Sequence, residues 1–150
     1  MSVSRDVVQV VIVTFNRAEY LRKCLLALQA QTHPIRQIVV VNNCSTDHTS
    51  DVLREVSAAG LPIQEYRTER NLGGAGGFAQ AFDLAKQQSS DWVWVMDDDV
   101  EPEPDCLAQL LMASDGYAVV QPSRYNDGED FQEVYRQVNI TNPLASLLQY

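Results

Sequence analysis

Val7–Thr14 reads VVQVVIVT, a nearly continuous run of apolar, β-branched residues. A run of this kind predicts a strand that is buried on both faces, as in a parallel sheet covered by helices. Gln37–Val41 (QIVVV) and Asp91–Met96 (DWVWVM) follow the same pattern, whereas Ile63–Arg67 (IQEYR) is weaker and more polar. Together with Tyr117–Gln121, these segments predict five strands.

Amphipathic segments between the strands predict helices, so that each strand–helix–strand unit is a crossover of a parallel sheet. At the first helix, Asn16 is the expected N-cap, and Glu19 would complete a capping box. Gly60 is the expected stop of the second helix. The predicted fold class is therefore α/β, with a mainly parallel sheet and helices on both faces.

The composition excludes several classes of protein. The chain has 150 residues, 45% of them hydrophobic, which suits one domain with a sizeable core. No apolar run approaches the roughly 20 residues of a membrane helix, so no transmembrane segment is expected. The net charge of −9 argues against a nucleic-acid partner. The three cysteines lack CxxC spacing, which favours a reducing compartment.

Seven of the 20 acidic residues lie at positions 91–105, and no Lys or Arg occurs at positions 87–123. Such a run is often a solvated loop. Here, however, Asp97, Asp98 and Asp99 directly follow a predicted strand, and three adjacent carboxylates repel one another without a cation. Hard oxygen ligands suit Mg²⁺ or Mn²⁺. Because side chains alternate along an extended chain, Asp97 and Asp99 are expected to face the metal together.

Two further polar clusters follow the first two strands, at the carboxyl ends where α/β sheets bind ligands. The first cluster is Thr14-Phe15-Asn16-Arg17, and the guanidinium of Arg17 suits phosphate oxygens. The second contains Asn42 and Asn43, whose amides can donate to and accept from a base. Each cluster has an ordinary alternative: a helix cap, a solvated arginine or a turn.

Asn71–Phe78 (NLGGAGGF) follows the third strand and is expected to be a loop that opens a helix. Its glycines are Gly73, Gly74, Gly76 and Gly77. Glycines would let the backbone approach a diphosphate or a sugar closely. Alternatively, Gly74–Ala79 fits the GxGxxA fingerprint of dinucleotide-binding oxidoreductases. That fingerprint belongs after a buried first strand, so an NAD-type protein is the weaker interpretation.

These segments resemble the N-terminal half of a family 2 glycosyltransferase with a GT-A fold. The matching pieces, in the family's order and spacing, are VVIVTFNR (Val10–Arg17), VVVNNCSTD (Val39–Asp47), NLGGAGGF (Asn71–Phe78) and VMDDDVEPEPD (Val95–Asp105). The galactofuranosyltransferase branch is the most similar, and rhamnosyltransferases are near relatives. The resemblance implies a Rossmann-like nucleotide-sugar-binding domain at residues 1–122 and the start of an acceptor-side region at residues 123–150.

The resemblance also implies donor contacts and a metal site. A UDP-sugar donor would contact Thr14, Phe15, Asn16, Arg17, Asn42, Asn43, Asn71, Gly73, Gly74, Gly76, Gly77, Asp97 and Asp98. A divalent cation, Mn²⁺ or Mg²⁺, would be held by Asp97 and Asp99 and would stabilise the leaving diphosphate. Family members often have Asp where Asn42 stands, so this sequence departs from the family pattern where uracil is recognised.

The implied activity is the transfer of a sugar, such as galactofuranose, with inversion to a glycan or a lipid-linked glycan. In this family the general base lies downstream of the metal motif. No acid after Asp105 is assigned to that role, so the chain is expected to be part of a longer transferase. The alternatives are a UDP-sugar-binding module without turnover and the less favoured NAD-type oxidoreductase. The expected location is the cytoplasm, or the cytoplasmic face of a membrane.

Overall fold

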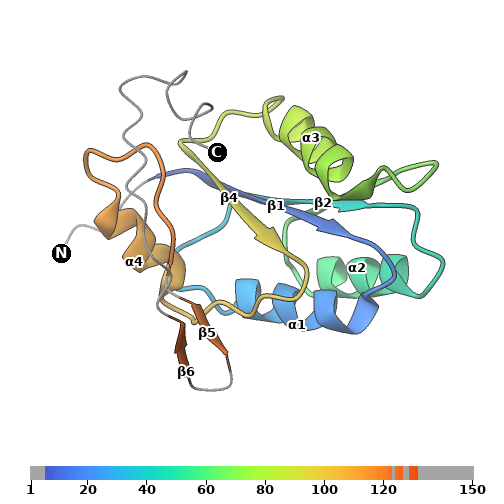
Figure 1. The fold of residues 1–150 in the computed structure, drawn as a ribbon, viewed down its shortest axis with the longest axis horizontal. Helices are drawn as coiled ribbons and strands as arrows, with labels where there is room; N and C mark the ends of the chain where they lie inside the picture. Colours follow the sequence, from blue (N-terminus) through green and yellow to red (C-terminus); the bar gives the residue numbers. More distant parts are fainter. Residues whose placement is uncertain (1–5, 123, 127–128, 132–150) are drawn as a thin grey trace. The chain divides into compact units, whose positions relative to one another are not determined.

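The computed structural model describes residues 6–122, 124–126 and 129–131 (Figure 1). The chain divides into two compact units, residues 1–109 and residues 110–150. The first unit is built around a four-stranded parallel sheet in the order β3-β2-β1-β4. Its strands are β1 (Val8–Thr14), β2 (Gln37–Asn42), β3 (Ile63–Arg67) and β4 (Trp92–Asp97).

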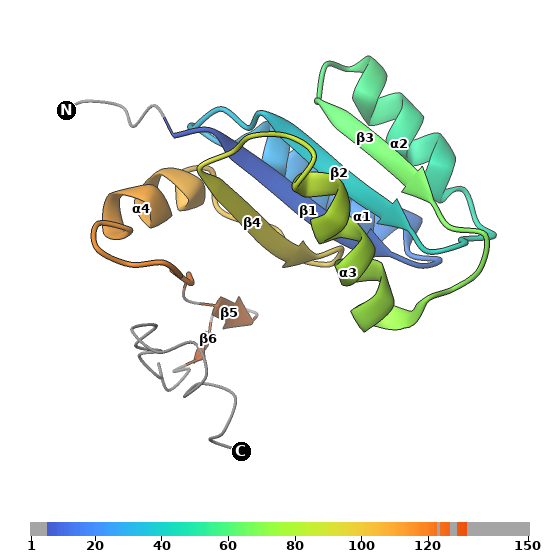
Figure 2. The ribbon, with the colours of Figure 1, turned by 90° about the horizontal axis from the view of Figure 1, so that it is seen from above.

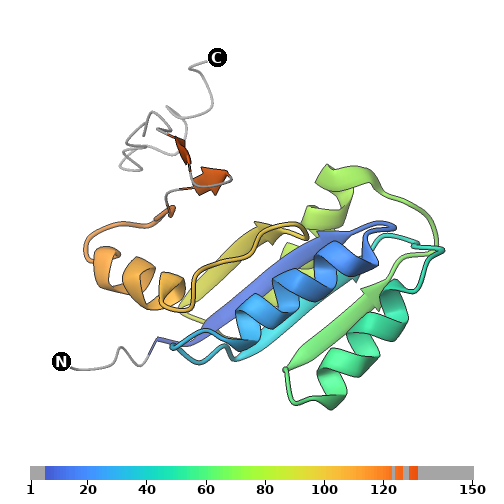
Figure 3. The same ribbon diagram turned by 90° about the horizontal axis from the view of Figure 1, so that it is seen from below.

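Helices cover both faces of this sheet. They are α1 (Ala18–Gln29), α2 (Thr49–Ala58) and α3 (Gly73–Ala85). A fourth helix, α4 (Cys106–Ala113), follows β4 in the chain. α3 lies on one face of the sheet (Figure 2), and α1 and α2 lie together on the other (Figure 3). Gly60 follows α2 with a φ of +105°, the left-handed stop that the sequence predicts. The predicted α/β architecture is confirmed.

β1 and β2 are buried on both faces, as their β-branched sequences predict. On one face, Val10 and Ile12 of β1 pack into a core with α1 and α2. On the other face, Val11 belongs to a smaller core with Ala81 and Ala85 of α3. The small side chains of α3 let this helix lie close to the sheet.

Among the described residues, β3 and β4 are the edges of the sheet. β3 is exposed along most of its length, which agrees with its polar sequence. The expectation that the apolar strand β4 is buried on both faces is wrong, since Val93 and Val95 are 38% and 44% exposed. The reason is that α3 packs against β1 and β2, so these two valines lie outside the surface that it covers.

The fifth strand predicted at Tyr117–Gln121 is not formed. These residues are irregular and mostly exposed, because no strand in the described part of the chain pairs with their backbone. The second unit instead contains an antiparallel pair, β5 (Arg124–Asn126) and β6 (Glu129–Phe131). Most of the expected acceptor-side region, residues 123–150, lies outside the described residues. None of the described helices is long and apolar enough to cross a membrane.

Candidate functional site

The carboxyl ends of the four strands meet at one edge of the sheet. In the pairing register, Thr14 lies beside Asn42, Asn42 beside Arg67, and Val13 beside Asp97. The segments that follow the strands therefore start at the same edge, as expected for parallel strands. This edge brings together the polar clusters predicted from the sequence.

The three aspartates at the end of β4 differ in exposure and in partners. Asp98 is 4% exposed, and its Oδ1 accepts a hydrogen bond of 3.1 Å from Nη1 of Arg17. The same nitrogen donates a bond of 2.9 Å to Oδ2 of Asp99. Asp97 is exposed, and no residue of the described chain forms an ion pair or a hydrogen bond with its carboxylate. Arg17 thus supplies part of the positive charge that adjacent carboxylates require.

The pKa values of this pair follow from its surroundings. Burial raises the pKa of Asp98, while the nearby Thr14 hydroxyl and the hydrogen bond from Arg17 oppose the shift. Hydrogen bonds to Asp99 and Asp98 raise the pKa of Arg17. Thr14, the last residue of β1, is buried beneath this pair. The guanidinium therefore stays charged at neutral pH.

The chemistry of Asp97 and Asp99 fits a divalent metal that arrives with a phosphate ligand. Both carboxylates are accessible, and the side chain of Asp99 is 42% exposed. In the part of the chain that the structure describes, no group of three or more His, Cys, Asp or Glu residues is arranged to hold a metal. Mg²⁺ is commonly held by one or two carboxylates, with substrate phosphates and water completing its shell. Two aspartates therefore suffice when a diphosphate is bound.

Asn16 does not cap α1, so the expected capping box with Glu19 is wrong. The N-cap of α1 is Arg17, without a side-chain hydrogen bond, and Asn16 has a left-handed φ of +53°. Oδ1 of Asn16 instead accepts hydrogen bonds from the backbone N–H groups of Thr46 (2.7 Å) and Asp47 (3.3 Å). Asn tolerates this conformation, and its side chain readily bonds nearby backbone groups. Asn16 thus ties the loop after β1 to the loop after β2.

Asp47 supplies the cap that α1 would otherwise lack. Its Oδ2 accepts a hydrogen bond of 3.1 Å from the backbone N–H of Ala18, and its Oδ1 accepts from the N–H and hydroxyl of Thr49. Although burial raises the pKa of Asp47, the hydrogen bonds from Thr49 and Ala18 lower it below the ordinary value. Asn16 and Asp47 therefore form a reciprocal clasp between the two loops.

Asp47→Ala is expected to lower the free energy of unfolding by about 1 kcal/mol, because it uncaps α1 and opens the clasp. Since the pKa of Asp47 is lowered on folding, this stabilisation is present at neutral pH and is lost as the pH falls through the folded-state pKa. Urea unfolding at pH 7 measures the loss. Asp51→Ala is the control, because Asp51 is exposed and pairs with Arg54 on the surface. Equal losses in the two variants would contradict the clasp.

Asn42 is fully buried, and its amide is engaged with the protein. Nδ2 donates to Oε1 of Glu65 (2.8 Å) and to Oγ of Ser50 (3.0 Å), while Oδ1 accepts from the backbone N–H of Ser45 (3.0 Å). Glu65 lies on β3, so this residue connects two strands and the start of α2. The sequence-based hypothesis requires an Asn42 side chain that is accessible to the nucleotide base. In the structure this side chain is buried and hydrogen-bonded within the protein.

Asn43 is also buried and connects β2 to the start of α3. Its Oδ1 accepts a hydrogen bond of 2.7 Å from the backbone N–H of Leu72, and its Nδ2 donates to the carbonyl of Gly73 at 3.1 Å. Asn71 is exposed, and its Oδ1 accepts from the N–H of Gly73 at 2.8 Å. These asparagines position the glycine-rich segment at the sheet edge.

The glycine-rich segment is the first part of a helix rather than a loop, because α3 begins at Gly73. Gly76 and Gly77 have no room for a side chain: an added Cβ would lie 2.8 Å from Cβ of Leu72 and 2.5 Å from Cγ1 of Val13, respectively. Gly73 and Gly74 are exposed and open. The GxGxxA interpretation fails, since these glycines follow the third strand and not the first.

The predicted contacts therefore separate into two groups. Asn16, Asn42, Asn43, Gly76 and Gly77 hold the loops and α3 in place, and Thr14 and Asp98 are buried. The groups that remain accessible at the sheet edge are Phe15, which is 43% exposed, with Arg17, Asn71, Gly73, Gly74, Asp97 and Asp99. The structure brings an aromatic ring, a guanidinium, two carboxylates and a helix N-terminus to one edge.

Gln31 is a positioning residue that the sequence does not reveal. Its Nε2 donates to the carbonyl of Glu103 at 2.8 Å, and its Oε1 accepts from the N–H of Leu107 at 3.0 Å. These bonds attach the acidic segment after β4 to the end of α1. No local sequence pattern predicts this role, because Gln31 lies 72 and 76 residues from its partners.

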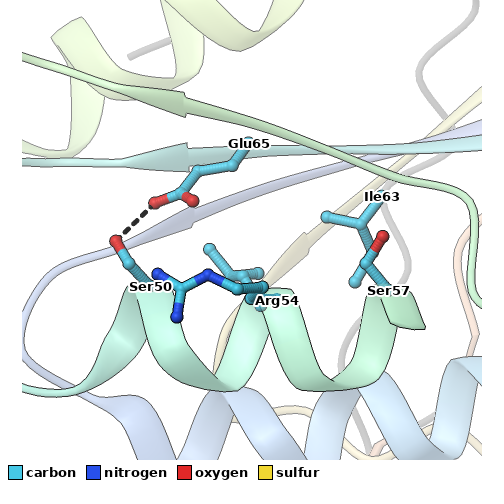
Figure 4. A pocket seen from close by; sticks show the side chains of 6 residues that line it. Ser50, Arg54, Ser57, Ile63 and Glu65 are labelled. Carbon is cyan, nitrogen blue, oxygen red and sulfur yellow. Dashed lines mark hydrogen bonds between the residues drawn. The ribbon is translucent and has the colours of Figure 1, made fainter. Parts of the chain in front are cut away.

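A hollow of about 180 Å³ lies between α2 and β3 (Figure 4). Its lining residues are Ser50, Leu53, Arg54, Ser57, Ile63 and Glu65. The hydroxyl of Ser50 donates to Glu65 across the hollow at 2.7 Å. None of the predicted donor or metal residues lines it, so the hollow is separate from the candidate site.

Comparison with known proteins agrees with the fold. The model of glycosyl transferase family 2 matches residues 9–149, and the chain belongs to this family. Galactofuranosyltransferase GlfT1 of Mycobacterium tuberculosis is 39% identical over 116 residues, which are 75% of this chain and 37% of that protein.

Two solved structures share the GT-A type of fold. S. aureus TarS 1–349 in complex with UDP has a TM-score of 0.63 and 26% identity, over 73% of this chain and 32% of that one. The mannosyltransferase PcManGT from Pyrobaculum calidifontis, in complex with GDP-Man and Mn²⁺, has a TM-score of 0.63 and 25% identity, over 72% and 32%. The chain thus spans about a third of the length of these relatives.

Proposed function

We propose that this chain is the donor-binding part of an inverting, metal-dependent glycosyltransferase that transfers a sugar from a UDP-sugar to a glycan or a lipid-linked glycan. The observation that carries the proposal is the pair of accessible carboxylates, Asp97 and Asp99, beside Arg17 at the open edge of the sheet. Family membership supports it, as do the UDP bound to TarS and the GDP-Man and Mn²⁺ bound to PcManGT.

In this proposal Asp97 and Asp99 hold the metal, which when bound supplies positive charge to the leaving diphosphate. Arg17 adds a second positive charge for the phosphate oxygens. Phe15 offers an aromatic face to the base. The buried Asp98 borders the ribose and anchors Arg17.

The remaining expected contacts act on the donor in two ways. The N-terminus of α3 is accessible at Gly74, where the backbone N–H favours an anionic ligand, whereas the N–H of Gly73 donates to Oδ1 of Asn71. Asn16, Asn42 and Asn43 act indirectly, through the hydrogen bonds that hold the donor loops together. The base is therefore recognised by other groups than the Asn42 amide.

We further propose galactofuranose as the donor sugar. The support is the 39% identity to a protein named galactofuranosyltransferase, over 75% of this chain. A panel of UDP-galactofuranose, UDP-galactopyranose, UDP-glucose and dTDP-rhamnose, each titrated with MnCl₂ present, tests this choice. Tightest binding of another sugar nucleotide would reject galactofuranose without affecting the proposed donor site.

Asp97→Asn/Asp99→Asn is expected to weaken UDP binding in the presence of MnCl₂ by at least about tenfold, since even outer partners of a metal site contribute roughly that much. Isothermal titration calorimetry measures the change. Asp51→Asn/Asp83→Asn is the matched control, because it removes the same charge from two exposed carboxylates on α2 and α3. Equal UDP affinity in the two double variants, or none in the unmodified chain, would reject the proposed function.

A further inference from the structure

Arg17 occupies an unusual position for a residue expected to bind a diphosphate. Its Nη1 lies 3.1 Å from Oδ1 of Asp98 and 2.9 Å from Oδ2 of Asp99, so one nitrogen bridges two adjacent carboxylates. The guanidinium carbon also lies 5.1 Å from the centre of the Tyr20 ring, where the aromatic face stabilises a cation. Arg17 therefore occupies one of the two carboxylates proposed for the metal.

The two carboxylates that Arg17 contacts differ in accessibility. The side chain of Asp98 is 5% exposed, whereas that of Asp99 is 42% exposed and that of Arg17 is 45% exposed. Breaking the bond to Asp99 leaves two solvated groups, while breaking the bond to Asp98 would leave a buried carboxylate without this partner. The bond to Asp99 is therefore the one that a ligand can replace at low cost.

Oδ2 of Asp99 already accepts the guanidinium N–H at 2.9 Å, so a divalent metal on the same carboxylate would lie close to a second cation. The two cations would repel each other at this distance, unless negative charge lies between them. A nucleoside diphosphate supplies that charge, because its oxygens can bind the metal and a guanidinium at the same time. Among the described residues, Arg17 is the one cation that pairs with the aspartates at the end of β4.

We propose that Arg17 is a built-in counter-ion of the metal site, which yields Asp99 to the metal only when a nucleoside diphosphate binds. The guanidinium stays anchored to Asp98 and turns toward the phosphates. This inference rests on the proposed function. It adds that the metal and the donor bind together, and that the affinity of the site for the metal is low when no donor is present.

The proposal predicts that the binding of Mn²⁺ and the binding of UDP are coupled, and that Arg17→Gln weakens this coupling. In the unmodified chain, UDP strengthens Mn²⁺ binding, and Mn²⁺ strengthens UDP binding by the same factor. Arg17→Gln removes the competing cation, so Mn²⁺ alone is expected to bind at least about fivefold more tightly, which is the lower end of typical couplings. The dependence of Mn²⁺ binding on UDP should decrease correspondingly.

The test titrates MnCl₂ into the full chain, with and without UDP, and follows free Mn²⁺ by electron paramagnetic resonance. Arg36→Gln is the matched control, because Arg36 is an exposed arginine just before β2, at the amino ends of the strands and away from the candidate site. Arg17→Lys keeps the charge and is expected to behave more like the unmodified chain. Circular dichroism and thermal unfolding confirm that each variant is folded.

The outcomes separate this inference from the proposed function. Tighter binding of Mn²⁺ alone by Arg17→Gln, but not by Arg36→Gln, supports the counter-ion. Suppose that the unmodified chain binds UDP in an Mn²⁺-dependent way, but folded Arg17→Gln binds Mn²⁺ no more tightly than Arg36→Gln. This result would reject the counter-ion role of Arg17 and leave the proposed donor site unaffected. If the unmodified chain binds no UDP with Mn²⁺, both are rejected.

Discussion

Asn42→Asp is expected to lower the free energy of unfolding by about 3 kcal/mol or more, because it places an unpaired charge in the core. Asn42 is fully buried, and its Nδ2 donates to Oε1 of Glu65 at 2.8 Å. Aspartate would set two carboxylates at that distance and would lose the donors to Glu65 and Ser50. Urea unfolding followed by circular dichroism measures the loss.

Glu65→Gln provides the rescue for this variant. In Asn42→Asp/Glu65→Gln, the amide of the new glutamine can donate to the new aspartate, so the bond between β2 and β3 is restored with its polarity reversed. We expect the double variant to recover most of the stability that Asn42→Asp loses, and the double-mutant cycle to show coupling. A double variant no more stable than Asn42→Asp would contradict the proposed pairing.

This pair places a carboxylate next to Asn42, the position at which the sequence departs from the pattern of the family that it resembles. The negative charge expected on β2 is present in this protein on β3, at Glu65, within hydrogen-bonding distance of the amide.

Gly77→Ala is expected to lower the free energy of unfolding by about 2–3 kcal/mol, because it overpacks the contact between α3 and β1. The added Cβ would lie 2.5 Å from Cγ1 and 3.2 Å from Cγ2 of Val13. Valine is stiff at χ1, so either α3 or β1 must move. Thermal and urea unfolding measure the effect, and movement of α3 should also weaken UDP binding.

Gly74→Ala is the matched control for this substitution. It lies in the same helix, three residues earlier, and its added Cβ would meet nothing within 4 Å. Because alanine favours helix, Gly74→Ala should be neutral or stabilising, by up to about 1 kcal/mol. Val13→Ala/Gly77→Ala should regain part of the loss in Gly77→Ala. If Gly77→Ala were as stable as Gly74→Ala, the close packing would be disproved.

Much of the fold could be predicted from local patterns. The β-branched runs of β1 and β2 predict strands buried on both faces, and both are buried. The polar sequence of β3 predicts an exposed strand, and it lies at an edge. The strand expected at Tyr117–Gln121 is not formed, because a strand needs a neighbour that pairs with it, and a local pattern does not show whether one is present.

The candidate site could be located from the sequence, but its internal roles could not. Polar residues after parallel strands must gather at one edge, and Asp97 and Asp99 are accessible there. Nothing local indicates that Asn16 contacts the loop at Thr46, or that Asp47 caps α1, because these partners are 29 or 30 residues apart.

The sequence by itself therefore determined the α/β class, the parallel order of strand and helix, and an acidic strand end. These follow from side-chain branching, alternation and charge, which are local properties of the chain. Only the tertiary structure decided which polar groups bind the protein and which remain open to a ligand. A buried amide must satisfy its hydrogen bonds with whatever the fold brings to it, and for Asn42 that partner is Glu65, 23 residues away.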